Sequence, residues 1–317
     1  MMRIRSKSIA VAAALLLAAA PFAMAQNEGQ GQGKATVTIL PSGGNDGAAG
    51  VAQDAVHVQV DARDASITRW QSTKGTSAPV EVVLMIDNGA RASLGRELGD
   101  IRHFLETLPP NVKATVAYME YGRAALAGPL TDDHQKLVAM LHLPVGAPGM
   151  DASPYFCLSD LAKHWPSQDQ SARREVIMIT DGIDYYEPHY DPEDPYLQAG
   201  IRDAVRADVV VYSIYWKDSG LLGRSGYAAN AGQSLLSEVT AETGGSSYWI
   251  GYGNPVSLTP YFDDFKERVN NQYELGFLAP LRGKSEVESL KVKIEAHDVK
   301  VTSPQKTWVS PAGPNPQ

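Results

Sequence analysis

The sequence contains a single cysteine, Cys157, so no disulfide can form within the chain. Cys157 lies in the helix-like stretch 153–165, and we interpret it as a buried thiol that behaves as a small hydrophobe. A nucleophilic role would need a nearby base, and the sequence does not point to one.

Catalytic signatures are also lacking. The sequence has no G-x-S-x-G, no H-E-x-x-H, no P-loop and no G-x-G-x-x-G after a strand. We therefore expect no enzymatic activity, and keep as an alternative a hydrolase that uses Asp87 or Asp181. Basic residues are scarce as well, with 28 Lys and Arg against 36 Asp and Glu and a net charge of −8. This balance argues against nucleic acid as the main partner.

Long apolar runs are absent after the first 25 residues, so we expect no membrane insertion of the mature chain. The first 25 residues have the pattern of a secretory signal peptide: an apolar run over 9–20 and an A-x-A site ending at Ala25, preceded by three cations, Arg3, Arg5 and Lys7. We predict cleavage near Ala25 and a secreted or periplasmic protein. An N-terminal membrane anchor is the alternative.

The pattern along the chain changes several times and predicts the following regions: a signal peptide (1–25), a flexible polar leader (26–35), N-terminal β segments and a link (36–79), an α/β domain (80–272), C-terminal β segments (273–309) and a disordered tail (310–317).

Within 80–272, apolar strands alternate with amphipathic helices. The run "VEVVLMI" is typical of a buried parallel strand. An apolar face of leucines and Ile101 then predicts a helix up to Leu108, capped by Ser93. The fold class expected is therefore α/β, a doubly wound, mostly parallel sheet with helices on both faces. The flanking β segments predict a small antiparallel β add-on built from both termini.

Two aspartates follow buried strands. Asp87 comes after "VVLMI" and Asp181 after "VIMIT", and both lead into turns that contain glycine. Because ligands of open α/β sheets bind beyond the carboxyl ends of the strands, we expect a site at this rim.

These motifs, with the closing "ETGGSSYW" and "NNQYELGF", resemble a von Willebrand factor type A (VWA) domain over roughly residues 80–280. More narrowly, the chain resembles the VWFA-related acidobacterial proteins. The resemblance implies a metal-ion-dependent adhesion site (MIDAS), built from Asp-x-Ser-x-Ser, a Thr from a later loop and a final Asp.

Carried over to this sequence, Asp87 and Asp181 match the two Asp positions of that site. Gly89 and Arg91 fall on the two Ser positions, and neither supplies an oxygen ligand. The loop 145–154 has no Thr, so Ser153 or Asp151 is the candidate third ligand.

Three interpretations of this site stay open. Arg91 could supply the positive charge of the missing metal by pairing with Asp181 or Asp87. It could instead point to solvent while the aspartates cap the turn and helix. A cation site for Mg²⁺ or Ca²⁺ with substituted ligands is the third.

The segment 180–196 follows Asp181 and is expected at the same rim. It is rich in carboxylates and aromatic side chains, which predicts a partner-contact loop. A solvated loop and a calcium loop are the alternatives. With Arg91, the predicted partner-binding residues are Asp184, Tyr185, Tyr186, Glu187, His189 and Tyr190.

Together these features predict a secreted or periplasmic, VWA-type protein-recognition module with a degenerate MIDAS-like site. No cofactor is expected, and a metal-dependent adhesion module that uses Mg²⁺ or Ca²⁺ is the alternative. The sequence names no protein partner and does not define the oligomeric state.

Overall fold

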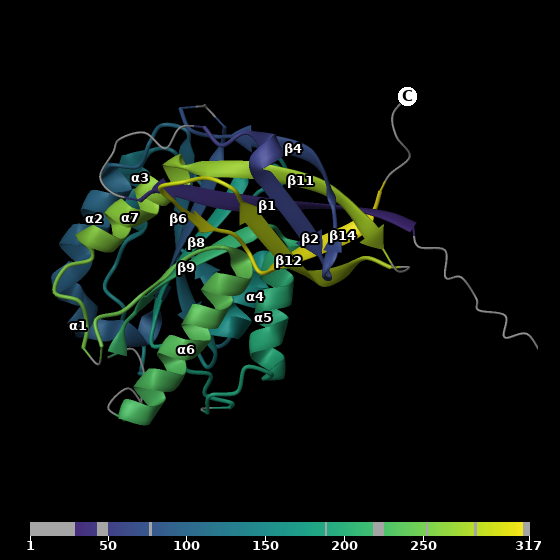
Figure 1. Ribbon diagram of the computed structural model, residues 1–317. Coiled ribbons are helices and arrows are strands. Elements are labelled where there is room, and N and C mark those ends of the chain that lie inside the picture. The colour runs from purple at the N-terminus through teal and green to yellow at the C-terminus, as the bar shows by residue number, and fades with distance from the viewer. Residues whose placement is uncertain are drawn as a thin grey trace, which may run out of the picture.

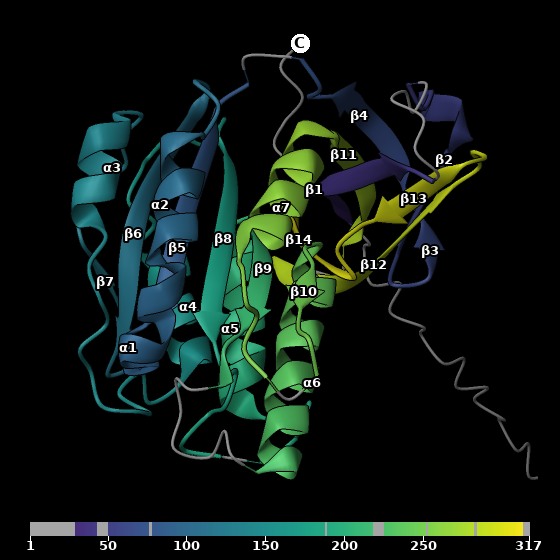
Figure 2. The ribbon, with the colours of Figure 1, turned by 90° about the vertical axis from the view of Figure 1, so that its left-hand side faces the viewer.

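The structure is a computed structural model that describes residues 29–42, 50–75, 78–187, 189–217, 225–251, 253–281 and 284–312. The predicted signal peptide lies outside these residues. The chain forms two sheets that lie side by side, one covered by helices and one antiparallel (Figures 1 and 2). Among the described residues, no helix combines the length and the apolar character needed to cross a membrane.

The first sheet has six strands in the order β10-β9-β8-β5-β6-β7. All neighbours are parallel except β6 and β7. Its strands are β5 (Val80–Asp87), β6 (Val112–Glu120), β7 (Arg123–Leu126), β8 (Arg173–Thr180), β9 (Val209–Tyr215) and β10 (Ser247–Tyr248). The strand order reverses between β5 and β8, where a ligand site is expected.

Helices cover both faces of this sheet, as predicted (Figure 2). On β5, Val82, Leu84 and Ile86 join the core cluster of one face, whereas Val83 and Met85 join that of the other, because successive side chains of a strand alternate. One face packs against α2 (Leu98–Glu106), α3 (His134–Met140) and α7 (Thr259–Asn270). The opposite face packs against α4 (Pro154–Lys163), α5 (Pro195–Arg206) and α6 (Gly226–Thr243).

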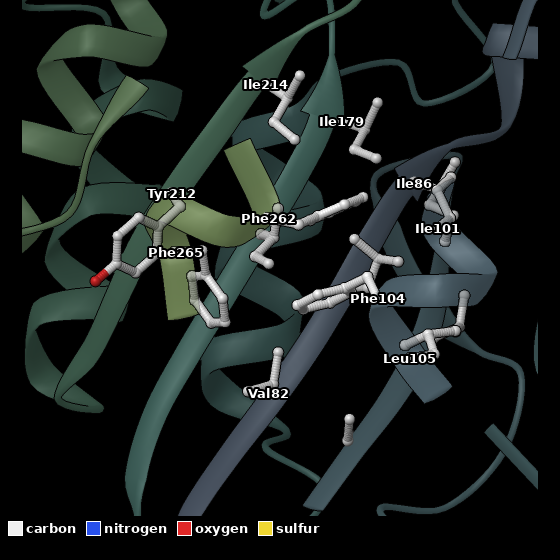
Figure 3. Packing of buried hydrophobic residues seen from close by; sticks show 14 of the residues in the cluster. Val82, Ile86, Ile101, Phe104, Leu105, Ile179, Tyr212, Ile214, Phe262 and Phe265 are labelled. Atoms are coloured by element: carbon white, nitrogen blue, oxygen red, sulfur yellow. The ribbon is translucent and has the colours of Figure 1, made fainter. Parts of the chain in front are cut away.

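Aromatic side chains pack α2 against α7 on the face of the sheet that also contacts α3 (Figure 3). The rings of Phe104 and Phe262 stack with centroids 4.3 Å apart, and Phe265 meets Phe104 edge-on at 5.8 Å. Phe104 and Phe262 are each only 1% exposed, so this stack belongs to the core that supports β5.

The second sheet has eight strands and is antiparallel. The expected β add-on exists and comes from both ends of the chain, but it is not small, because it has its own apolar core. Its strands are β1 (Gly29–Pro41), β2 (Val56–Val60), β3 (Arg63–Asp64), β4 (Ser66–Ser72), β11 (Gln272–Leu281), β12 (Glu286–Ile294), β13 (Val299–Thr302) and β14 (Lys306–Pro311). The one-turn helix η1 (Gln53–Ala55) precedes β2.

The flexible leader predicted over 26–35 is wrong from Gly29 onward. This stretch is the first half of β1, and it pairs with β11 from Gly29–Leu281 onward. Its glycines have a packing reason: a Cβ at Gly33 would collide with the ring of Phe277, and one at Gly31 would collide with Val309. These glycines, although typical of linkers, are therefore required here, because the side chains of Phe277 and Val309 occupy the space that a Cβ would need.

Several predicted boundaries also need correction. The single helix expected up to Leu108 is broken into α1 (Arg91–Leu94), η3 (Gly95–Glu97) and α2, and the one-turn helix η2 (Asn88–Ala90) precedes it. The tail predicted from 310 still belongs to β14 at Pro311, and residues 313–317 lie outside the described part.

A buried polar network joins the two sheets at the start of β11. The guanidinium of Arg173 donates to the side-chain oxygen of Gln272, and Gln272 Nε2 donates to Glu175 Oε1 at 2.9 Å. At the edge of the same interface, Lys34 Nζ lies 2.7 Å from Asp208 Oδ2. The antiparallel sheet is thus fixed to the base of β8, at the end of the parallel sheet opposite the carboxyl rim.

Candidate functional site at the carboxyl ends of β5 and β8

The two predicted aspartates are brought together by parallel pairing of β5 with β8. Asp87 is fully buried. Its Oδ1 accepts a hydrogen bond from Gly89 N at 2.8 Å, and its Oδ2 accepts one from Thr180 Oγ1 at 3.1 Å. Asp181 is also fully buried, and it accepts bonds from Ile183 N at 3.1 Å and from the Tyr185 hydroxyl at 3.0 Å.

Of the two candidates for the third ligand, Asp151 lies near Asp87 and Asp181, whereas Ser153 bonds elsewhere. Both carboxylate oxygens of Asp151 are buried and have no hydrogen-bond partner. Ser153 instead caps α4, where its Oγ accepts from Phe156 N at 3.4 Å and donates to Asp184 Oδ2 at 2.7 Å. A buried carboxyl group without hydrogen-bond donors is costly in its charged form. The burial of Asp151 without such donors is therefore the unusual feature of this site.

The electrostatics of the cluster follow from burial and from like charge. Burial raises the pKa of Asp151 well above its usual range, and the nearby Asp87, Asp181 and Asp184 raise it further. Burial likewise raises the pKa of Asp181 to about 7, although hydrogen bonds, among them those from Ile183 N and the Tyr185 hydroxyl, oppose the shift. The pKa of Asp184 is raised for the same reason. Burial and like charge therefore both favour the protonated forms of these carboxyl groups.

Sequence reasoning missed two residues that shape the site. Thr180, the last residue of β8, donates to Asp87 and accepts from Gly182 N at 3.2 Å. Tyr155 is fully buried on α4, and its hydroxyl donates to the carbonyl of Gly182 at 2.5 Å. The position of Thr180 at the end of a strand was the signal that could have identified it. The role of Tyr155 becomes visible only once α4 packs against the sheet.

Of the interpretations open for Arg91, the structure agrees with the solvent-facing one rather than with pairing to an aspartate, and Asp87 caps the turn η2 through Gly89 N. Arg91 is exposed, and its Nε donates to the carbonyl of Gly146 at 2.9 Å. In the described part of the chain it forms no ion pair with Asp87 or Asp181. Its backbone has φ 50°, a conformation that favours glycine. Ser93 is not a helix cap either: its Oγ donates to Ala90 O at 2.7 Å and accepts from Trp216 Nε1 at 2.9 Å.

The residues present do not fit a divalent cation well. Gly89 has no side-chain oxygen, and both carboxylates of the expected pair are already bonded to donors of the protein. Among the described residues, no group of three or more His, Cys, Asp and Glu is placed to hold a metal ion. Hard cations need several convergent oxygen ligands. Of the three aspartates, only Asp151 has carboxylate oxygens without a hydrogen-bond partner in the part of the chain that the structure describes.

The loop after Asp181 divides into an inner and an outer part. Asp184 is buried, with Oδ1 accepting from Tyr186 N at 2.8 Å, and Tyr185 turns its hydroxyl to Asp181. Asp184 is therefore wrong as a predicted partner contact, whereas Tyr185 is half-buried and its contact role stays a prediction. The others of the loop are exposed as expected: Tyr186, Glu187, His189 and Tyr190.

An exposed aromatic cluster lies beside this loop. The ring of Phe156 on α4 lies 5.6 Å from that of Tyr186 and 4.6 Å from that of Tyr196 on α5. Tyr186 is 62% exposed and nearby Tyr190 is 48% exposed. Phe156 was not predicted as part of the site, because its sequence position indicates only a helix.

The chain is similar in fold to VWA-domain proteins. No protein-family model and no curated protein matches it. A von Willebrand factor type A protein from Catenulispora acidiphila matches at 13% identity and TM-score 0.41, over 89% of this chain and 75% of that one. The ArnB paralog VWA2 from Sulfolobus acidocaldarius matches at 10% identity and TM-score 0.40, over 88% and 76%.

An aerotolerance-related membrane protein from Bacteroides fragilis matches at 13% identity and TM-score 0.43, over 61% of this chain and 99% of that one. At such identities and TM-scores these similarities carry nothing about function, which has to be argued from the residues of this chain.

Proposed function

We propose that this protein is a VWA-type recognition module that binds a protein partner at the carboxyl rim of its parallel sheet, without a catalytic role and without a resident metal ion. The observation that carries the proposal is the cluster of Phe156, Tyr186 and Tyr196 beside the buried acidic site. Partly exposed aromatic rings held against one another are typical anchors of protein interfaces.

The loop is anchored by hydrogen bonds of Asp184 near its start and of Asp194 at its end. Asp184 is bonded to Ser153 and to the backbone of Tyr186, and Asp194 caps α5 through Tyr196 N and Leu197 N at 2.8 Å. Two buried carboxyl groups thus hold the loop at both ends. Such preorganisation lowers the entropy cost of binding, which supports a contact role for the tyrosines between them.

The partner surface can be tested by affinity capture with the mature chain as bait, followed by quantitative mass spectrometry. A double variant, Tyr186→Ser with Tyr196→Ser, removes the rings and leaves the buried acids in place. Tyr227→Ser, at a tyrosine that is 61% exposed on α6, is the matched control. The proposal fails if no captured protein is lost from the double variant while retained by the control.

The metal-free state rests on the donor set. Burial and the neighbouring carboxyl groups raise the pKa of Asp151 and so favour its protonated form over a charged ligand. Calorimetric titration with Mg²⁺, Mn²⁺ and Ca²⁺ is expected to give no saturable binding. Micromolar binding that disappears in Asp87→Ala would contradict this part and favour the metal-dependent adhesion module.

Export is the remaining part of the proposal. The signal peptide pattern over residues 1–25 supports a secreted or periplasmic location. The intact mass of the protein purified from its own cells is expected to match cleavage near Ala25. A mass that includes residues 1–25 would favour the N-terminal anchor instead.

A further inference from the structure

A groove of about 500 Å³ lies between the two sheets, away from the acidic site. One wall is formed by the end of α6, the edge strand β10 and Trp249, which directly follows β10. The other wall comes from β12 and β13 of the antiparallel sheet, including Lys291 and Lys300. Its volume is within the range of about 300–1,000 Å³ that ligand sites have.

Both strands on the antiparallel side have an open edge at this groove. β12 pairs with β14 over Glu286–Ser289, and beyond Ser289 no described strand pairs with that side. β13 pairs with β1 on one side only. β12 and β13 follow one another in the sequence, but they do not pair within the described residues. A gap therefore separates their two unpaired edges.

The backbone groups that face this gap can be assigned from the ladders. Leu290 N donates to Gln305 O at 2.7 Å on the open side, so Val292, two residues on, turns the same way. In β1, Ile39 N donates to Asn271 O at 2.9 Å, toward β11. Its neighbours in β1 therefore bond to β13, and Val301 is left facing outward. Unused edges of this kind are templates for another strand.

The charge of the groove is opposite to that of the protein. The chain has a net charge of −8, yet among the described residues no Asp or Glu lines the groove, whereas Arg268, Lys291 and Lys300 do. Arg268 is paired with Asp264 at 2.5 Å. In the described part of the chain, the ammonium groups of Lys291 and Lys300 form no ion pair. The free charge of the groove is therefore positive.

We propose that this groove binds an extended acidic peptide segment of a partner protein, which adds as a strand between β12 and β13. The open edges supply main-chain hydrogen bonds, as in other cases of strand addition. Lys291 and Lys300 pair with carboxylates of the segment, and Trp249, which is 44% exposed, offers an apolar contact at the end of the groove. An anionic polysaccharide would satisfy the lysines but not the alternating backbone groups.

The test uses a fluorescent peptide of about six residues, the usual length of a strand, that alternates glutamate and valine. Fluorescence anisotropy with the mature chain is expected to give saturable binding. The double variant Lys291→Glu with Lys300→Glu is expected to weaken binding by about tenfold or more, because two attractions become repulsions. Lys293→Glu is the matched control: Lys293 lies on the same strand beside Glu295, outside the groove, and is expected to leave binding unchanged.

Hydrogen exchange gives a readout that charge alone cannot produce. Peptide binding is expected to slow exchange of the amides of Val292 and Val301, and N-methylation of alternate peptide residues is expected to abolish binding. The proposal is overturned if the acidic peptide does not bind, if the lysine–valine counterpart binds equally, or if N-methylation has no effect. Binding of polyglucuronate in place of the peptide would assign the groove to a polysaccharide and overturn it as well. Because the groove shares no residue with the rim, loss of binding here leaves the proposed function unaffected.

Discussion

The buried carboxyl group of Glu175 is expected to make the stability of this protein depend on pH. The side chain is fully buried where the two sheets meet. Its Oε1 accepts from Gln272 Nε2 at 2.9 Å, and its Oε2 has no hydrogen-bond partner. Burial raises the pKa of Glu175 from 4.5 to about 7, and the Arg173 guanidinium opposes only part of that shift.

The sign and size of the effect follow from linkage. Between pH 4.5 and about 7, the folded protein keeps a proton on Glu175 that the unfolded chain has released. The free energy of unfolding therefore falls as pH rises through this window and levels off above it. Since one pKa unit corresponds to about 1.4 kcal/mol, the loss from Glu175 alone is about 3 kcal/mol.

Urea unfolding of the wild type and of Glu175→Gln at a series of pH values measures this loss. The amide keeps an oxygen that can accept from Gln272 but does not titrate. Asp181, whose pKa is also raised to about 7, adds a similar pH dependence to both proteins, so the quantity of interest is the difference between them. The variant is expected to gain about 3 kcal/mol over the wild type between about pH 4.5 and 8. A difference that stays constant with pH would refute the reasoning.

Three further predictions concern packing and backbone strain. Gly232→Ala is expected to cost about 3 kcal/mol of unfolding free energy, because its Cβ would collide with the carbonyl oxygen of Asp181. Gly99→Ala, in a helix with open space around the site, is expected to stabilise by about 0.5–1 kcal/mol; equal effects at the two glycines would contradict the collision. Arg91→Gly should be more stable than Arg91→Ala by about 1 kcal/mol, since φ is 50°, and the reverse order in urea unfolding would show that no strain is stored. Phe104→Ala should lose about 3–5 kcal/mol in the same assay through its stacked, buried ring, and a cost below about 1 kcal/mol would mean that the core refills.

Much of the parallel sheet could be predicted from the sequence because its signals are local. A strand buried on both faces is apolar throughout, as β5 is over Val80–Asp87. An aspartate that ends such a strand must lie at the carboxyl rim, so the positions of Asp87 and Asp181 required no knowledge of packing. Pro195 at the start of α5 marked the first turn of that helix for the same kind of reason.

The parts that depend on long-range contacts could not be predicted. Gly33 resembles a linker residue until Phe277, 244 positions later, is placed across the sheet from it. The sequence left Asp151 as one of two candidate ligands, and only the fold shows that it is buried beside three other carboxyl groups, which together raise its pKa. The direction of Arg91 depends on the carbonyl of Gly146, in a different loop.

The sequence by itself therefore determined which residues form the central parallel strands and where the acidic rim lies. Both follow from the apolar character of short runs of residues and from the aspartates that end them. Only the tertiary structure decided that the rim is a crowded carboxyl cluster with an outward-facing Arg91. It also decided that the two ends of the chain build a full second sheet with an open, positively charged groove. Charge crowding and glycine packing arise between segments distant in the sequence, and no local pattern records them.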